Sequence, residues 1–204
     1  MMNLFALIPV KDPVRGKSRL APLLGPSERR ALNLALIRRT LQVCAEVFGA
    51  ARTVVVTSSQ TVREMAGAFR VQVVEEDASQ HDLNLALAAA AAFAIRAGAD
   101  GLVAIPIDLP LLSAPLLRAA IDKMPDAPGC VLVPDRRGKG TNLLAFAPPT
   151  QEIFAFGEPS LERHTLRSKQ LGYQVVVHHC DRLALDLDLP EDYACLENTA
   201  TWPL

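Results

Sequence analysis

Hydrophobic residues recur along the chain with two alternating spacings, and this pattern predicts strands that alternate with helices. Short, nearly continuous apolar runs are typical of strands that are buried on both faces of a sheet. Apolar residues three or four positions apart predict helices instead, with Ser27 and Ser113 as candidate N-caps. The expected strands are 4–10, 53–57, 71–74, 102–105, 131–133, 143–146, 175–178 and 185–187. The expected helices are 27–47, 60–69, 84–97, 113–124, 161–171 and 191–198.

Alternation of strands and helices over most of the chain predicts an α/β fold. We expect a doubly wound, mostly parallel sheet with helices on both faces. The sequence shows no linker and no internal repeat, so a single domain over residues 1–204 is expected. In such sheets, ligands bind beyond the carboxyl ends of the strands, and the loops that follow the strands are therefore the places to search for a site.

Composition excludes several classes of protein. Half of the 204 residues are hydrophobic, which is enough for a core and too many for a disordered chain. A formal net charge of −1 argues against a general nucleic-acid or membrane-surface binder, so any bound anion must be held by a local cluster of cations. The four cysteines form no C-x-x-C pair, and no apolar run approaches the roughly 20 residues that span a bilayer. We therefore expect a cytoplasmic protein.

The loop after the first expected strand is rich in cations. Lys11, Arg15, Lys17 and Arg19 fall within nine residues, and Ser18 adds a hydroxyl. Cations and free backbone N–H groups after a strand are what a polyphosphate requires. A P-loop is excluded, because it would need glycine at position 11. An exposed basic loop without a function is the alternative that local composition leaves open.

Two segments carry prominent carboxylates. Asp108 follows the expected strand 102–105 within a turn that is stiffened by prolines. Asp186 and Asp188 lie two residues apart, and on an extended segment they would share a face at roughly 7 Å. Such a set suits one or two hard divalent cations such as Mg²⁺. The alternatives are a simple turn residue for Asp108 and a solvated edge strand for the pair.

Three further segments contain candidate binding residues. Thr141 ends a glycine-containing basic loop, which is either a site for an anionic substrate or a plain hairpin loop. Gly157 and Ser160 precede a helix, where they would hold a phosphate, although Ser160 is equally suited to be an N-cap. Asn84 opens the alanine-rich helix, either as a cap or as an amide that reads a base.

Five segments, taken together and in order over residues 7–192, resemble a known family. They are IPVK…GKSRLAP, IDLPLL, PDRRGKGTNLL, FGEPS…RH and LALDLDLPED. The chain is similar to the 2-phospho-L-lactate guanylyltransferases of coenzyme F420 biosynthesis, whose bacterial relatives use phosphoenolpyruvate or 3-phospho-D-glycerate. The resemblance implies a GT-A-like nucleotidyltransferase fold. It also implies transfer of GMP from GTP to the phosphate of a small phosphorylated carboxylic acid, with release of pyrophosphate. A homodimer is a family-level expectation.

The resemblance also implies roles for particular residues. The metal ligands for Mg²⁺ would be Asp108, Asp186 and Asp188. The acceptor would be held by Thr141, Gly157 and Ser160. The nucleotide would contact Lys11, Lys17, Ser18, Arg19 and Asn84, and the catalytic residues would be Lys17, Arg19 and Asp108. Asp82 stands where many family members have glycine, which is a departure close to Asn84.

The implied reaction needs no general base, because a phosphate with a second pKa near 6 is already an anion at pH 7. The acceptor itself stays open among the three phospho-acids, although a composition rich in Ala, Leu and Arg favours the two bacterial acceptors. Two alternatives stay open as well. One is a nucleotidyltransferase of the same fold that acts on a molybdopterin, a sugar phosphate or a methylerythritol phosphate. The other is a catalytically silent nucleotide-binding protein.

Overall fold

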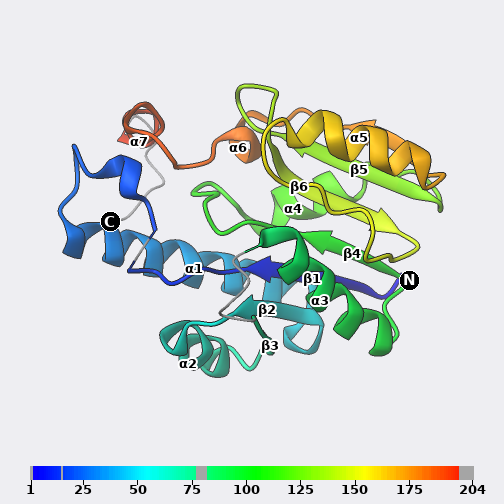
Figure 1. Ribbon diagram of the computed structural model, residues 1–204, viewed down its shortest axis with the longest axis horizontal. Coiled ribbons are helices and arrows are strands. Elements are labelled where there is room, and N and C mark those ends of the chain that lie inside the picture. Colours follow the sequence, from blue (N-terminus) through cyan, green and yellow to red (C-terminus); the bar gives the residue numbers. More distant parts are fainter. Residues whose placement is uncertain (1, 15, 77–81, 198–204) are drawn as a thin grey trace.

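A seven-stranded sheet forms the centre of the computed structural model, which describes residues 2–14, 16–76 and 82–197 (Figure 1). Its strand order is β3-β2-β1-β4-β6-β5-β7. All neighbouring strands are parallel except where β6 pairs antiparallel with both β4 and β5, which confirms the prediction of a mostly parallel sheet. The strands are β1 (Leu4–Pro9), β2 (Thr53–Thr57), β3 (Gln72–Glu75), β4 (Gly101–Ala104), β5 (Gly129–Pro134), β6 (Thr141–Ala147) and β7 (Gln174–Val177).

Helices cover both faces of the sheet, as predicted. One face packs against α1, α2 and α4, and the other packs against α3 and α5. No helix among the described residues is both long and apolar enough to cross a membrane. The helices are α1 (Pro26–Phe48), α2 (Gln60–Ala68), α3 (Leu83–Arg96), α4 (Ala114–Ile121), α5 (Ser160–Gln170), α6 (Asp181–Ala184) and α7 (Pro190–Glu197). Two short 3₁₀ turns are η1 (Ser18–Leu20) and η2 (Ala50–Arg52).

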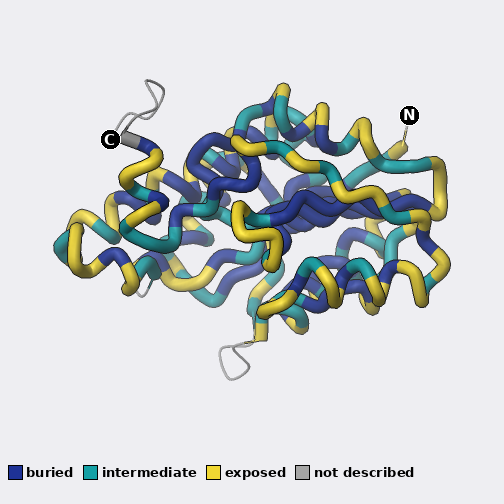
Figure 2. Tube along the Cα trace, turned by 90° about the horizontal axis from the view of Figure 1, so that it is seen from above, coloured by how far each residue is buried: buried dark blue, intermediate teal, exposed yellow. Residues whose placement is uncertain are grey.

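The central strands are apolar on both sides because each side faces a separate core. In β1, Ala6 and Ile8 point into the core that contains α1, whereas Phe5 and Leu7 point into the core that contains α3. Figure 2 shows these strands as a buried layer between outer helices that are exposed on one side. This two-sided burial is the physical reason for the continuous apolar runs in the sequence.

A third, smaller cluster of leucines lies where several loops meet, and we call it the edge cluster. It joins the turn η1, the start of α1, the loop after β4, the segment before α7 and α7 itself. Leu185 and Leu187 belong to it, and they alternate with Asp186 and Asp188. Burial of these leucines therefore anchors the chain segments that carry the predicted functional carboxylates. The buried members are Leu20, Leu32, Leu36, Leu111, Leu185, Leu187 and Leu196.

The predicted strand 185–187 is wrong. This segment is an extended connection between α6 and α7, and the short helix α6 was not predicted. The amide of Leu187 donates to the carbonyl of Asp108 at 2.9 Å, which joins the segment to the loop after β4 rather than to the sheet. The alternation of apolar and polar residues in this segment arises because its leucines pack in the edge cluster, not because the segment forms a strand.

The start of α1 also differs from the prediction. The N-cap is Gly25 rather than Ser27, and Pro26 occupies the first helical position. Proline has a fixed φ that suits this position, and the side chain of Glu28 accepts a hydrogen bond from the Gly25 amide at 2.6 Å. Ser113 does occupy the N-cap of α4, without a capping hydrogen bond from its side chain.

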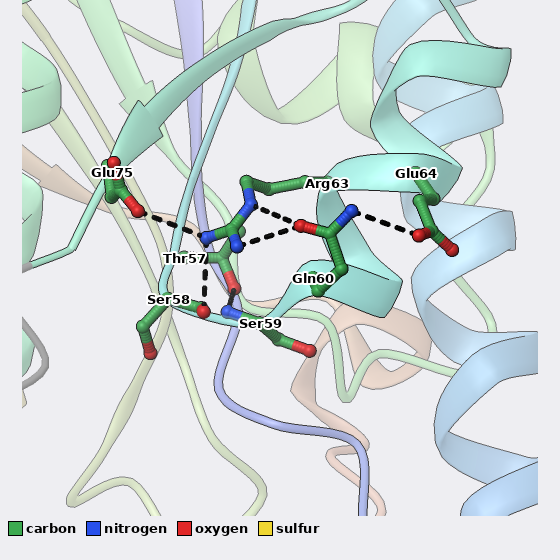
Figure 3. A network of polar contacts seen from close by, with 7 residues as sticks. All are labelled: Thr57, Ser58, Ser59, Gln60, Arg63, Glu64 and Glu75. Atoms are coloured by element: carbon green, nitrogen blue, oxygen red, sulfur yellow. Dashed lines mark hydrogen bonds and ion pairs between the residues drawn. The ribbon is translucent and has the colours of Figure 1, made fainter.

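A polar network fixes the sheet edge beyond β2 and β3 (Figure 3). Arg63 of α2 donates to the carbonyl of Ser58 at 3.1 Å and to Glu75 at 3.3 Å. Its Nε and Nη2 both donate to Gln60, at 3.1 and 2.9 Å. The guanidinium thereby connects the loop after β2 with the last residue of β3, which limits the freedom of both segments at this edge.

Phe146 provides a test of the core on the α5 side. Its side chain is fully buried and packs edge-on against Phe154 and Tyr173, with ring centroids at 6.0 and 6.1 Å. We expect Phe146→Ala to lower the free energy of unfolding by about 3–5 kcal/mol through cavity formation. The control Phe146→Leu keeps most of the volume and should cost under about 1.5 kcal/mol. Urea denaturation measures both, and equal losses would contradict this packing.

Candidate active site

The predicted functional residues gather at the end of the sheet where its parallel strands have their carboxyl termini. Strands β1, β2, β4 and β5 end on this side of the sheet, and the antiparallel strand β6 begins there. The register pairs Pro134 with Thr141 and Ala104 with Leu144, so Thr141 lies level with the loops that follow β4 and β5. The expectation that the carboxyl ends of the strands carry the site is in accord with this arrangement.

The ammonium of Lys17 lies between two of the predicted carboxylates. Its Nζ is 2.8 Å from Oδ1 of Asp188 and 3.6 Å from Oδ2 of Asp108. The Lys17 side chain is only 7% exposed. Its backbone has a φ of 58°, in the left-handed region that non-glycine residues seldom occupy and that costs roughly 1–3 kcal/mol. The fold sustains this strain at the residue that bridges Asp108 and Asp188.

A buried amide holds the basic loop in place. Asn33 of α1 is 2% exposed, and its Nδ2 donates to the carbonyl of Pro13 at 2.8 Å. A Cβ at position 16 would lie 2.6 Å from the same nitrogen, so Gly16 is required for this close approach. Asn33 was not predicted from the sequence. The available signal was an amide at a position where the helix is otherwise apolar.

Other residues of the basic loop surround a cavity beside Lys17. Lys11 lines this cavity together with Lys17, Asp108 and Asp188. Most of the remaining lining is apolar, and Asp12 and Glu76 are two further carboxylates. The apolar residues are Pro9, Val10, Pro13, Val56, Leu83, Ala86, Pro106 and Ile107. Ser18 and Arg19 are exposed and line a shallow neighbouring depression with Lys17 and Asp188. Arg15, also predicted here, lies outside the described residues.

Burial and mutual repulsion make the carboxylates of this site reluctant to ionise. Burial raises the pKa of Asp108, Lys17 opposes this effect, and Asp188 reinforces it. Burial, followed by the charge of Asp108, raises the pKa of Asp186 to about 6. Burial by itself would lower the pKa of Lys17, but Asp108 and Asp188 outweigh it and the net pKa is raised. Lys17 therefore stays protonated and supplies the positive charge that these carboxylates need.

The three aspartates predicted to bind metal are not arranged in a preformed coordination geometry. Among the described residues, no group of three or more histidine, cysteine, aspartate or glutamate side chains has metal-binding spacing. Oδ1 of Asp108 is nevertheless buried without a hydrogen-bond partner in this part of the chain. A divalent cation would satisfy that oxygen and relieve the repulsion at Asp186, so the donor chemistry fits Mg²⁺. The magnesium role of these aspartates stays a prediction.

Asp192 positions the segment that carries Asp188. It is the third residue of α7, 4% exposed, and its Oδ2 accepts the backbone N–H groups of Asp188 at 3.1 Å and Leu189 at 2.8 Å. Its Oδ1 accepts from Nη2 of Arg136 at 2.8 Å. This residue was not predicted from the sequence, although a carboxylate at the third position of a helix is a known capping signal. Arg136, one cation of the basic loop before Thr141, is therefore paired with a carboxylate of α7.

Two of the predicted acceptor residues lie in contact with each other. The hydroxyl of Ser160 donates to Oγ1 of Thr141 at 3.3 Å, and the same oxygen is 2.9 Å from Nδ1 of His164. Ser160 is the first residue of α5, and the N-cap is Pro159. Gly157 lies in the loop that leads into α5, is exposed and has a φ of 105°, which requires glycine. His164 lies one helical turn after Ser160 and ends the motif FGEPS…RH, but no role was predicted for it from the sequence.

Asn84 joins the nucleotide side of the site to the loop that contains Gly157. Its Oδ1 accepts from the amide of Phe156 at 2.7 Å, and its Nδ2 donates to the carbonyl of Phe156 at 3.2 Å. Both ends of this amide are therefore engaged, and its predicted contact with a nucleotide stays a prediction. Asp82 is the N-cap of α3, and its carboxylate accepts the amides of Asn84 at 2.7 Å and Leu85 at 3.3 Å.

Asn142 connects the two halves of the site. It follows Thr141 on β6, and its Nδ2 donates to the carbonyls of Leu183 at 3.0 Å and Ala184 at 3.1 Å. Pro134 pairs with Thr141 and Val133 pairs with Leu143, so the register shifts at Asn142. Thr141 therefore contacts α5 while Asn142 contacts α6. This buried amide thereby places the segment with Asp186 and Asp188 relative to the strand that carries Thr141.

Comparison with known proteins identifies the family. The family model described as "Guanylyl transferase CofC like" matches residues 4–197. The chain belongs to this family. A phosphoenolpyruvate guanylyltransferase from Rubrobacter xylanophilus is 34% identical over 196 residues, which cover 96% of this chain and 94% of the relative. A 2-phospho-L-lactate guanylyltransferase from Methanothermobacter thermautotrophicus is 30% identical over 191 residues, covering 94% and 81%.

Solved structures with the same fold are more distant in sequence. A nucleotidyl transferase from Methanothermobacter thermautotrophicus superposes with a TM-score of 0.66 at 19% identity, covering 96% of this chain and 95% of that one. A cytidylyltransferase from Leptospira borgpetersenii superposes with a TM-score of 0.60 at 17% identity, covering 97% and 86%. These likenesses confirm the predicted α/β fold. Membership in the CofC-like family confirms the prediction of a nucleotidyltransferase of the guanylyltransferase class.

The raised pKa of Asp186 predicts how stability depends on pH. Because the native pKa of about 6 exceeds the ordinary value near 3.9, the native state binds more protons between these values. The free energy of unfolding therefore falls as pH rises through this window. In buffer with EDTA, Asp186→Asn should raise the free energy of unfolding by about 1–2 kcal/mol at pH 7, after a discount for partial exposure. Below about pH 4 it should not change the free energy of unfolding.

Urea denaturation from pH 4 to 8 measures this effect. Asp126, exposed in the loop before β5, is the matched control, and Asp126→Asn should keep the free energy of unfolding at pH 7 within about 0.5 kcal/mol of the wild type. A gain for Asp186→Asn that is the same at pH 4 and pH 7 would show that burial does not perturb this carboxyl group.

Proposed function

We propose that this protein transfers GMP from GTP to the phosphate of phosphoenolpyruvate and releases pyrophosphate, as a step in coenzyme F420 biosynthesis. The observation that carries the proposal is the Lys17 ammonium between Asp108 and Asp188, beside a cavity at the carboxyl ends of the strands. Relatives named phosphoenolpyruvate guanylyltransferase, 34% and 31% identical over 96% and 94% of the chain, support this acceptor over the other two phospho-acids.

The cavity beside Lys17 suits a nucleoside triphosphate. Its apolar walls favour a base and a ribose, while Lys11 and Lys17 supply the charge that phosphates require. Ser18 and Arg19 lie exposed next to Lys17, within reach of a polyphosphate that extends out of the cavity. Glu76 also lines the cavity, directly after β3, and a carboxylate accepts both the N1–H and the 2-amino group of guanine.

The reaction is an in-line displacement at the α-phosphorus of GTP. A phosphate oxygen of the acceptor forms the new bond while the bond between the α-phosphorus and the bridging oxygen to the β-phosphate breaks, and pyrophosphate leaves. The acceptor phosphate is already an anion at neutral pH, so no residue has to remove a proton. Lys17 and Arg19 stabilise the charge of the departing pyrophosphate.

The acceptor lies on the other half of the site in this proposal. The hydroxyl of Thr141 and the backbone N–H groups at Gly157 and Ser160 hold its anionic groups. Asp108, Asp186 and Asp188 would hold Mg²⁺, which when bound neutralises phosphate charge and aligns the two polyanions. Asp192 and Asn142 have a structural role, because their hydrogen bonds hold the segment that carries two of these aspartates.

The proposed function is tested by pyrophosphate release from GTP, phosphoenolpyruvate and Mg²⁺, with the product identified by mass. We expect turnover with GTP but not with CTP or ATP, and more slowly or not at all with 3-phospho-D-glycerate and 2-phospho-L-lactate. Asp188→Asn keeps the shape of the side chain but loses its charge and should lower kcat/KM at least about 100-fold. The control Asp181→Asn, exposed on α6, should retain activity. Near-normal turnover of Asp188→Asn would refute the role of this carboxylate.

Guanine recognition by Glu76 is tested with inosine triphosphate, which lacks the 2-amino group. The wild-type enzyme should prefer GTP to this analogue about tenfold or more, because a carboxylate would lose one hydrogen bond. Glu76→Gln should raise the KM for GTP and shrink that preference. The control Glu75→Gln, which alters the neighbouring carboxylate at the Arg63 network, should preserve the preference. An unchanged preference in Glu76→Gln would exclude Glu76 as the base reader.

A further inference from the structure

A buried histidine lies behind Thr141, whose hydroxyl the proposed function assigns to the acceptor. His164 of α5 is fully buried, and its Nδ1 is 2.9 Å from Oγ1 of Thr141. On its other side, Nε2 accepts the backbone N–H of Ala155 at 3.0 Å. The ring of Phe156 packs edge-on against the imidazole, with ring centroids at 4.5 Å. Every polar atom of the imidazole is thus engaged, and none of them faces solvent.

The contact with Ala155 determines the tautomer of this imidazole. A backbone N–H can only donate, so Nε2 must be unprotonated to accept it. A neutral imidazole carries one proton, which then resides on Nδ1. Burial, followed by the charges of Arg163 and Arg167, lowers the pKa of His164 to about 4, so the ring is neutral at physiological pH. Nδ1 is therefore the donor in the hydrogen bond to Thr141.

The direction of this bond decides what the hydroxyl of Thr141 can do. A hydroxyl oxygen has two acceptor positions and one hydrogen to donate. His164 occupies one acceptor position of Thr141, and the Ser160 hydroxyl, which donates at 3.3 Å, occupies the other. The hydrogen of the Thr141 hydroxyl has no acceptor among the hydrogen bonds of the described residues. It can only be donated to a group that enters the site.

We infer that His164 is a positioning residue that makes the Thr141 hydroxyl an obligate hydrogen-bond donor toward an anionic oxygen of the acceptor. This inference rests on the proposed function, in which Thr141 contacts the acceptor. A carboxylate or phosphate oxygen can only accept, so a fixed donor matches it, whereas a freely rotating hydroxyl must first be oriented. His164 touches neither substrate and acts through Thr141 alone.

Two conservative variants separate this role from plain structural support. His164→Asn keeps an N–H at the place of Nδ1 and can still donate to Thr141, but it loses the acceptor for Ala155. His164→Gln places an oxygen near the position of Nε2 and can still accept from Ala155, but it loses the donor to Thr141. Each variant loses one buried hydrogen bond, so urea denaturation should show similar losses of stability for the two.

The two variants should differ in their use of the acceptor. We expect His164→Gln to raise the KM for phosphoenolpyruvate about tenfold, as for one lost hydrogen bond to a charged group, with the KM for GTP unchanged. His164→Asn should keep both KM values within about twofold of the wild type. A purely structural histidine would raise both KM values, or affect both variants alike, and either result would overturn the inference.

The tautomer is measured without any activity. In a ¹⁵N two-bond correlation spectrum of the wild-type protein, the signals of His164 are those that disappear in His164→Gln. We expect a protonated Nδ1 and an unprotonated Nε2, and the reverse assignment would overturn the inference. If the wild-type enzyme turned over none of the three phospho-acids with GTP, the proposed function would fail instead, and this spectrum would still decide which nitrogen donates to Thr141.

Discussion

The site depends on the ammonium group of Lys17, which lies between carboxylates from two other segments of the chain. Lys17 and Asp188 are 171 positions apart, yet their side chains lie 2.8 Å from each other. Without this cation, Asp108 and Asp188 would repel each other in a partly buried place, and Asp186 would add to the repulsion. The same constraint explains the left-handed backbone of Lys17, because the chain accepts local strain to put the ammonium there.

Apolar packing makes this electrostatic arrangement durable. The edge cluster buries Leu185 and Leu187, so the aspartates between and after them are turned outward to the site. Asp192 accepts hydrogen bonds from the amides of Asp188 and Leu189, and Asn142 donates hydrogen bonds to carbonyls of the preceding helix α6. The charged residues therefore need no large network of their own, because leucine packing and buried hydrogen bonds position their backbone.

Hydrophobic periodicity predicted the fold well because it is imposed locally by burial on two faces. The strands from β1 to β7 and all helices of eight residues or more were predicted within a few positions. The predicted strand 185–187 was wrong for an instructive reason. Alternating leucines and aspartates indicate one apolar face, but they do not say whether that face packs on a sheet or on the edge cluster. Cap positions such as Gly25 were also missed, because proline at the next position determined the helix start.

The sequence by itself determined the α/β class, the cationic loop, the three aspartates and a resemblance to the family that the comparisons establish. These are properties of spacing and residue type along the chain. Only the tertiary structure decided which partners the polar groups have. Asn84 binds the backbone of Phe156, His164 directs the hydroxyl of Thr141, and Lys17 stands between two aspartates. The reason is physical: a hydrogen bond depends on the distance and direction between two atoms, and these become definite only when separate segments pack against one another.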